Sequence, residues 1–222
     1  MKTRILIAIA ASLIFCTCLL LPAFAQELKP IQLPQPKLDE SKSLAQALRD
    51  RKTAREYRSG NLSEQALSNL LWAAFGINRS DSGRRTAPSA RHWEEIDVYV
   101  AAADGLFLYD PKANALIPVV KEDIRALTGT QSYFKDAAIN LVYVADLSKM
   151  GAGGEGEADK MCLTAQDTGF IGQNVYLYCA SEGLATVFRA LIDKQKLAEA
   201  MKLRTDQRIT GAQTVGLPKS GK

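Results

Sequence analysis

The order of the apolar patterns along the chain limits its fold more than any other feature. Apolar and more polar residues alternate over Ile96–Val100, which is the period of a half-buried strand. Gly105–Tyr109 and Ala115–Val120 lie on either side of a turn and predict a hairpin. Ile139–Ala145 is the most apolar strand pattern, and Gln207–Val215 is a last one. These strands show no regular alternation with helices, so we expect a mostly antiparallel sheet rather than βαβ units.

Helical patterns flank these strands. The clearest follows Ser63, a predicted N-cap, and continues through Leu67, Leu70, Leu71 and Ala74 until Gly76 stops it. A long helix is predicted over Asp159–Glu182, closed by Gly183. Further helices are predicted from Ser41, with Leu44, Ala47 and Leu48 on one face, over Glu122–Leu127 and over Lys194–Leu203. The fold class is therefore α+β, with helices around a central sheet, and no internal repeat or second domain is visible.

The first residues have the composition of an export signal. Met1–Arg4 is basic, Ile5–Ala25 carries no charge, and Ala23-Phe24-Ala25 supplies the small residues that a signal peptidase requires. We expect a signal peptide over residues 1–25, cleavage before Gln26, and a periplasmic or secreted protein with no stable membrane insertion afterwards. A retained anchor is the alternative, since 21 uncharged residues are just enough to span a bilayer.

Two further features accompany the signal. Cys16 and Cys18 raise the alternative of a lipoprotein, although Phe15 and Thr17 before them do not favour lipidation. Residues 26–40 hold three prolines among polar residues and predict an extended arm, so that residues 41–222 form the folded domain.

Composition and charge exclude several classes of protein. The chain is 47% hydrophobic and 23% charged, which excludes a disordered or collagen-like chain. Its formal charge of +4 falls by two when Lys2 and Arg4 leave with the signal, so nucleic acid is not an expected partner. Cys162 and Cys179 fall in one predicted helix, about 25 Å apart, and are expected to be free thiols that are mostly buried.

Two motifs that suggest other chemistry are weak. Gly151–Gly156 fits G-x-G-x-x-G, but four residues separate it from the preceding strand and a long helix follows, so a solvated loop is the better interpretation. His92 is the only histidine, and one histidine does not build the usual metal sites. We expect no metal, and no nucleophile motif of the G-x-S-x-G type is present.

A basic stretch is more informative. Arg51 and Arg55 are four residues apart and would project from one side if the preceding helix continues, with the hydroxyl of Thr53 between them. Two guanidinium groups and a hydroxyl suit a phosphate dianion. A solvated helix end, at which cations favour the helix dipole, is an equally good interpretation of the charges alone.

Five segments together resemble one family. Arg51–Arg55 resembles the R-x-S-x-R signature of the FMN-dependent nitroreductases, and Leu62–Gly76 resembles their following helix, especially in the branch of the thiazoline and oxazoline peptide dehydrogenases. Arg85–Arg91 resembles the "APSS" loop, Asp167–Leu184 the central helix, and Val215–Lys219 the terminal "VGYP" segment. All five occur in the order and spacing of the family.

The resemblance implies a homodimer that joins through long helices and binds one FMN at each of two sites on the subunit interface. The implied phosphate and ribityl ligands are Arg51, Lys52, Thr53 and Arg55, with Gly216 and Lys219 at the phosphate end. The implied neighbours of the flavin ring are Pro88, Ser89 and Ala90 on one side and Ala190 and Leu191 on the other. A dianion needs fixed cations, and a flavin ring needs a flat apolar wall.

Some residues depart from the family pattern. His92 stands where many members have an asparagine beside the flavin, and Glu94 stands where glutamine is common. Arg189–Leu191 replaces a Glu-Gly pair, which leaves the contacts on that side open.

The activity that the resemblance implies is ping-pong electron transfer. A donor reduces FMN, and a nitroaromatic, quinone or similar acceptor removes the electrons. We assign no side chain as an acid or base. The usual donor, NAD(P)H, is cytoplasmic, so an exported member needs another donor. Two alternatives stay open, an exported flavin-binding module without turnover and an interaction protein on the same fold.

Overall fold

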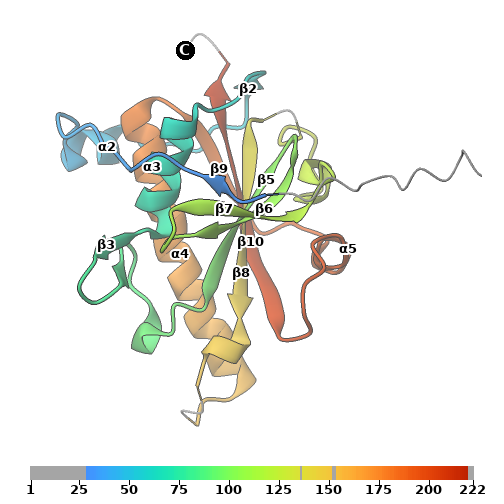
Figure 1. Cartoon of the computed structure of the whole chain (residues 1–222). Coiled ribbons are helices and arrows are strands. Elements are labelled where there is room, and N and C mark those ends of the chain that lie inside the picture. Colours follow the sequence, from blue (N-terminus) through green and yellow to red (C-terminus); the bar gives the residue numbers. More distant parts are fainter. Residues whose placement is uncertain (1–28, 136, 152–153, 220–222) are drawn as a thin grey trace, which may run out of the picture.

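The sheet is organised around its last strand, β10 (Gln207–Pro218), as Figure 1 shows. The computed structural model describes residues 29–135, 137–151 and 154–219. β10 pairs with β8 along one edge and with β9 (Ala185–Arg189) and β2 (Tyr57–Arg58) along the other. All pairings of the sheet are antiparallel. The remaining strands follow in the order β8 (Ile139–Asp146), β5 (Ile96–Ala102), β6 (Gly105–Asp110), β7 (Ala115–Val120) and β1 (Ile31–Gln32). The predicted α+β class with an antiparallel central sheet is confirmed.

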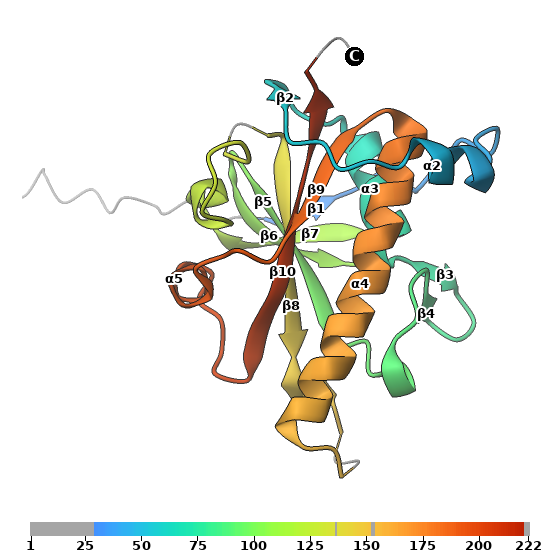
Figure 2. The same ribbon diagram turned by 180° about the vertical axis from the view of Figure 1, so that it is seen from behind.

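Helices cover the sheet on both faces (Figure 2). α3 (Glu64–Phe75) and α4 (Glu157–Glu182) pack on one face, where Leu70, Leu71 and Ile171 are buried. α5 (Lys194–Ala200) packs on the other face, and its Leu197 is also buried. Because both faces are covered, β8 is buried along its whole length and β5 is buried at most of its positions. Tyr99 in β5 is 6% exposed, so the prediction of a half-buried strand there is wrong.

The helix boundaries follow the capping signals. Ser63 accepts a hydrogen bond from the N–H of Ala66 at 3.2 Å at the start of α3, and Gly76 is its C-cap. Gly183 ends α4 in the left-handed conformation, with φ 68°, which glycine adopts without strain. The helices predicted over 63–76 and 159–182 and the hairpin of β6 and β7 are therefore confirmed.

Other elements differ from the expectations. No strand is predicted for β9, and the segment between α3 and β5 holds a small two-stranded sheet of β3 (Ile77–Arg79) and β4 (Arg84–Arg85). The helix predicted over Glu122–Leu127 is a single 3-10 turn at Arg125–Leu127. Further 3-10 turns lie at Ala90–His92 and Leu147–Lys149.

The described part of the proline-rich arm lies against the domain. β1 pairs with β7, and Leu33 is buried in the core. The side chain of Asn69 accepts a hydrogen bond from the N–H of Lys37 at 2.7 Å and donates one to the carbonyl oxygen of Lys37, also at 2.7 Å. The signal peptide predicted over residues 1–25 lies outside the described residues. Within the described ranges, no helix is long and apolar enough to cross a bilayer.

α2 (Leu44–Asp50) is the helix predicted from Ser41, and its apolar face is only partly covered. Ala47 is buried, but Leu44 and Leu48 are 64% and 53% exposed, so two of the three apolar residues face outward. Both cysteines of α4 are free, as expected, but only Cys179 is buried and Cys162 is exposed.

Candidate functional site

The segment after α2 is extended rather than helical. The N–H of Arg51 donates to the carbonyl oxygen of Ala47 at 2.9 Å and caps α2, which ends at Asp50. The chain then runs toward β9, where the N–H of Ala54 donates to the carbonyl oxygen of Thr186 at 2.9 Å. The helix does not continue through Arg55, so the side chains of Arg51 and Arg55 do not share a helix face.

Tyr176 of α4 holds this segment in place. Its hydroxyl oxygen accepts a hydrogen bond from the N–H of Phe188 at 2.9 Å and lies 3.1 Å from the hydroxyl oxygen of Thr53. The guanidinium carbon of Arg51 lies 5.4 Å from the centre of the Tyr176 ring, a cation–π contact. If Tyr176 donates its proton to Thr53, the proton of Thr53 stays available for an anion. Tyr176 is a site residue that the sequence motifs do not indicate.

A cleft of about 510 Å³ opens beside these contacts. Arg49, Arg51 and Lys52 line it on the α2 side, and Ala180, Gly183 and Ala185 line it where α4 meets β9. Small residues at that end leave room for a ligand close to the backbone.

Four cations of this region, here called the basic cluster, have no carboxylate within ion-pair distance among the described residues. They are Arg51, Lys52, Arg55 and Lys219. Lys52, Arg55 and Lys219 are exposed, and the N–H of Lys219 lies 3.4 Å from the carbonyl oxygen of Glu56. Unpaired cations around a hydroxyl favour the binding of an anion such as phosphate.

Gly216 lies on β10 next to this region and is buried. A Cβ atom at Gly216 would come within 2.9 Å of the Tyr57 ring, so the position requires glycine for close packing. Burial raises the pKa of the Tyr57 hydroxyl, which therefore stays protonated at neutral pH.

A second group of predicted residues lies in the loop before β5. Pro88 is exposed, whereas Ser89 and Ala90 are half-buried, and His92 is exposed. The hydroxyl of Ser89 donates to Glu95 at 3.1 Å, and the N–H of Ala90 donates to Asp167 of α4 at 2.9 Å. This group, residues 88–92, is called the 88–92 loop below.

The two groups lie apart on one protomer. The 88–92 loop is attached to α4 at Asp167, and the basic cluster is attached at Tyr176, nine residues further along the helix. Nine residues of helix span roughly 13 Å. Figure 2 shows α4 running past the sheet, with α2 crossing near its C-terminal end.

The third predicted group follows β9. Ala190 and Leu191 are exposed, Leu191 by 64%, whereas the preceding Arg189 is 4% exposed. Arg189 donates to the carbonyl oxygen of Thr128 at 2.6 Å and to the side chain of Asn140 at 2.8 Å. Burial lowers the pKa of its guanidinium to about 10.

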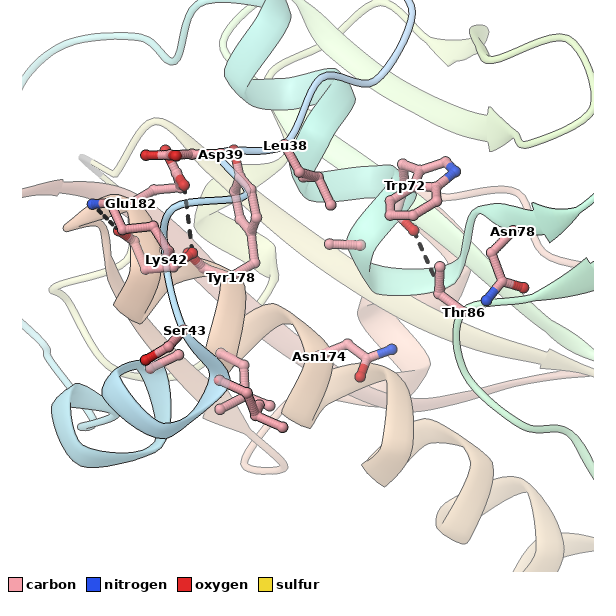
Figure 3. A pocket seen from close by; sticks show the side chains of 15 residues that line it. Leu38, Asp39, Lys42, Ser43, Trp72, Asn78, Thr86, Asn174, Tyr178 and Glu182 are labelled. Carbon is pink, nitrogen blue, oxygen red and sulfur yellow. Dashed lines mark hydrogen bonds between the residues drawn. The ribbon is translucent and has the colours of Figure 1, made fainter.

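A different hollow, of about 420 Å³, lies between α2, α3 and α4 (Figure 3). Trp72 and Thr86 lie on one side of it, and the hydroxyl of Thr86 donates to the carbonyl oxygen of Trp72 at 3.2 Å. Lys42 and Glu182 lie on the opposite side. The predicted site residues do not line this hollow, so we place the candidate site in the cleft beside Tyr176. Among the described residues, no group of three side chains could hold a metal ion.

Comparisons with known proteins converge on one family. The model of the family described as "Nitroreductase family" matches residues 48–217. A Methanocaldococcus jannaschii protein that bears a nitroreductase name is 29% identical over 186 residues, which cover 78% of this chain and 90% of that protein. A crystal structure from Ralstonia eutropha JMP134, described as a nitroreductase, is 38% identical, with a TM-score of 0.83 over 90% of this chain and 94% of the other.

A more distant structure shares the fold. It is a chain of the Escherichia coli microcin synthetase McbBCD complex, which is 21% identical, with a TM-score of 0.63 over 91% of this chain and 78% of the other.

Proposed function

Because the chain belongs to the nitroreductase family, we propose that it is an FMN-dependent oxidoreductase that acts as a homodimer. Membership of the family supports oxidoreductase chemistry. The basic cluster beside the cleft is the observation that supports the binding of FMN. Its donor set fits the phosphate end of FMN, since it combines four unpaired cations with the hydroxyl of Thr53.

In this proposal each part of the site has a separate task. Arg51 and Arg55 bind the phosphate, and Tyr176 fixes the hydroxyl of Thr53 so that it donates toward the ligand. The exposed Leu191 supplies apolar surface beside the ring. When bound, FMN would supply two-electron redox chemistry between a donor and an acceptor such as a nitroaromatic or a quinone. The protein's own residues bind and orient the cofactor and limit access to its ring.

The separation of the two groups supports a homodimer. A two-fold axis that crosses α4 antiparallel near residues 171 and 172 would place the partner's Asp167, and the 88–92 loop attached to it, beside this protomer's Tyr176. The outer face of α4 near that point is open, because Phe170 is 47% exposed and a Cβ at Gly169 would meet no atom within 4 Å. Leu44 and Leu48 of α2, a helix that packs against α4, are also exposed apolar side chains. A dimer through α4 would bury these side chains and complete the cleft.

We also propose that the protein acts outside the cytoplasm. The uncharged segment 5–25, with its A-x-A end, supports export, and the absence of a twin-arginine motif indicates that the chain crosses unfolded and takes up FMN afterwards. Its electron donor is then an extracytoplasmic small molecule or protein rather than NAD(P)H.

An absorption spectrum of the purified full chain tests the proposal. Oxidised flavin absorbs at about 450 nm, so a protein purified with its cofactor should be yellow, and heat should release free FMN from it. A protein purified without the cofactor should bind added FMN, which heat should release again. The double variant Arg51→Ala/Arg55→Ala should lose at least about 100-fold in FMN affinity, since each charge-assisted hydrogen bond contributes about 1.5–3 kcal/mol.

The matched control is Lys194→Ala/Lys196→Ala, which removes two exposed cations of α5 on the opposite face of the sheet. It should bind FMN like the unchanged chain. A colourless protein that does not bind added FMN would contradict the proposal.

A further inference from the structure

Two buried carboxyl groups lie beneath the 88–92 loop. Glu95 is fully buried just before β5, and Asp167 of α4 is 3% exposed. Each accepts a hydrogen bond from a different loop residue, Glu95 from the hydroxyl of Ser89 and Asp167 from the N–H of Ala90. The two carboxyl groups therefore hold consecutive residues of the loop.

The surroundings of this pair do not supply a compensating charge. Among the described residues, no cation lies within ion-pair distance of Glu95 or Asp167. The cations of the neighbouring segment are engaged elsewhere, since Arg85 pairs with Glu94 at 3.0 Å and Arg91 pairs with Glu155. His92, the only histidine of the chain, is exposed.

Two like charges in such a place are unfavourable, and one proton removes one of them. The oxygen Oε1 of Glu95 is buried and has no hydrogen-bond partner among the described residues, which fits a carboxyl group that carries a proton. Burial, with a smaller contribution from the negative charge of Asp167, raises the pKa of Glu95 to about 7.

The loop that the pair holds has an unusual backbone. Arg91, His92 and Glu94 adopt positive φ angles of 50°, 57° and 49°. Residues with side chains adopt this conformation only where the surroundings impose it. The hydroxyl oxygen of Ser89 contributes to this by accepting a hydrogen bond from the N–H of Glu94 at 2.8 Å. Ser89 thus connects the strained backbone directly to Glu95.

We propose that Glu95 and Asp167 are positioning residues that hold Ser89 and Ala90 in the conformation that faces the cofactor site as long as the carboxyl group of Glu95 carries a proton. Loss of the proton leaves two adjacent negative charges, which repel each other and loosen the loop. The effect on FMN binding rests on the proposed function, whereas the effect on the loop does not.

Trp93 provides a local probe of the loop, because the chain has only one other tryptophan, Trp72. In the full chain with Trp72→Phe, the emission of Trp93 should change with a midpoint near pH 7. The change should disappear in Glu95→Gln, which keeps the shape of the protonated side chain. It should persist in His92→Gln, the control for the neighbouring histidine. Persistence in Glu95→Gln, or loss in His92→Gln, would overturn the proposal.

If the Glu95→Gln protein does not fold, a second variant tests the same proposal. Asp167→Asn keeps an acceptor for the N–H of Ala90 but removes the like charge, so the midpoint should move down by about one pH unit. An unmoved midpoint would show that the charge of Asp167 does not act on Glu95 and would contradict the proposed pair.

Binding of FMN separates this inference from the proposed function. Affinity should weaken between about pH 6 and pH 8 in the unchanged chain relative to Glu95→Gln, whose own pH dependence reports the titration of FMN itself. If FMN binding has the same pH dependence in both proteins, the positioning role is contradicted and the proposed FMN-dependent function is not. If the Trp93 transition occurs as expected in a chain that does not bind FMN, the proposed function is contradicted and the effect of Glu95 on the loop is not.

Discussion

The hydroxyl oxygens of Thr53 and Tyr176 lie 3.1 Å apart, although the two residues are 123 positions apart in the sequence. The contact joins the extended segment after α2 to the C-terminal half of α4. The same tyrosine oxygen accepts the N–H of Phe188, so one side chain connects three elements at the wall of the cleft.

Tyr176→Phe should keep the fold and weaken the site. The ring remains for the contact with Arg51, but Phe188 loses its acceptor and Thr53 loses its partner. We expect FMN affinity to fall about 5- to 10-fold, in line with about 1 kcal/mol per hydrogen bond, measured by fluorescence titration. Tyr133→Phe is the control, because no hydrogen bond of its hydroxyl is found among the described residues. Unchanged affinity in Tyr176→Phe would remove this residue from the site.

Gly211→Ala should destabilise the sheet. A Cβ atom at Gly211 would meet the ring of Phe188, which stacks on Tyr143 with ring centres 5.8 Å apart. The partly buried ring would have to shift from its stacked position, so we expect a loss of about 1–3 kcal/mol in the free energy of unfolding, measured with urea. The added change Phe188→Leu should restore part of that loss. A double variant no more stable than Gly211→Ala would show that the ring is not the obstacle.

Phe170→Glu tests the homodimer. A charge on the open face of α4 should prevent helices from packing there, so light scattering should report a monomer for this variant and a dimer for the unchanged chain. FMN should be lost with the dimer, because each site would lack the partner's 88–92 loop. Gln195→Glu places the same charge on exposed α5 and should stay dimeric. A Phe170→Glu dimer that retains FMN would place the interface elsewhere.

Glu95→Gln should change how stability depends on pH. Since the pKa of Glu95 is raised from 4.5 to about 7 in the folded chain, the folded state binds more protons than the unfolded state between these values. The contribution of Glu95 to stability is therefore complete below about pH 4.5 and is lost as pH rises toward 7. Thermal melting should give a higher Tm for Glu95→Gln than for the unchanged chain at about pH 8, and a smaller difference at about pH 5. Glu122→Gln, at an exposed position, should show no such divergence.

Much of the fold is predictable because its signals are local. The cap at Ser63 and the glycine at position 183 mark α3 and α4 within a residue or two, and alternation marks the strands of the hairpin. β9 is missed because its Ala185–Arg189 segment has no alternating pattern and is a strand only through pairing with β10. The apolar period of α2 indicates an apolar face but not what covers it, and Leu44 and Leu48 face outward.

The charged residues of the candidate site are predictable from the sequence, but the residues that position them are not. Arg51 and Arg55 stand out in the sequence as two closely spaced cations beside a hydroxyl, and Arg51 lines the cleft, whereas Arg55 is exposed just beyond the lining residues. Tyr176 and Glu95 act through partners from distant parts of the chain, Thr53 and Asp167, and a single sequence does not report such pairs. Gly216 is required for packing against Tyr57, which only the tertiary structure reveals.

The short strand β1 lies close in sequence to residues 1–25. Cleavage of those residues and their retention as an anchor would therefore leave the sheet at very different distances from a membrane. Only five residues separate Ala25 from Ile31, the first residue of the sheet. A fully extended segment of that length reaches roughly 17 Å. A chain that kept its first 25 residues as an anchor would therefore carry the flank of its sheet almost against the lipid headgroups, whereas a processed chain would diffuse freely and meet its redox partners from every side.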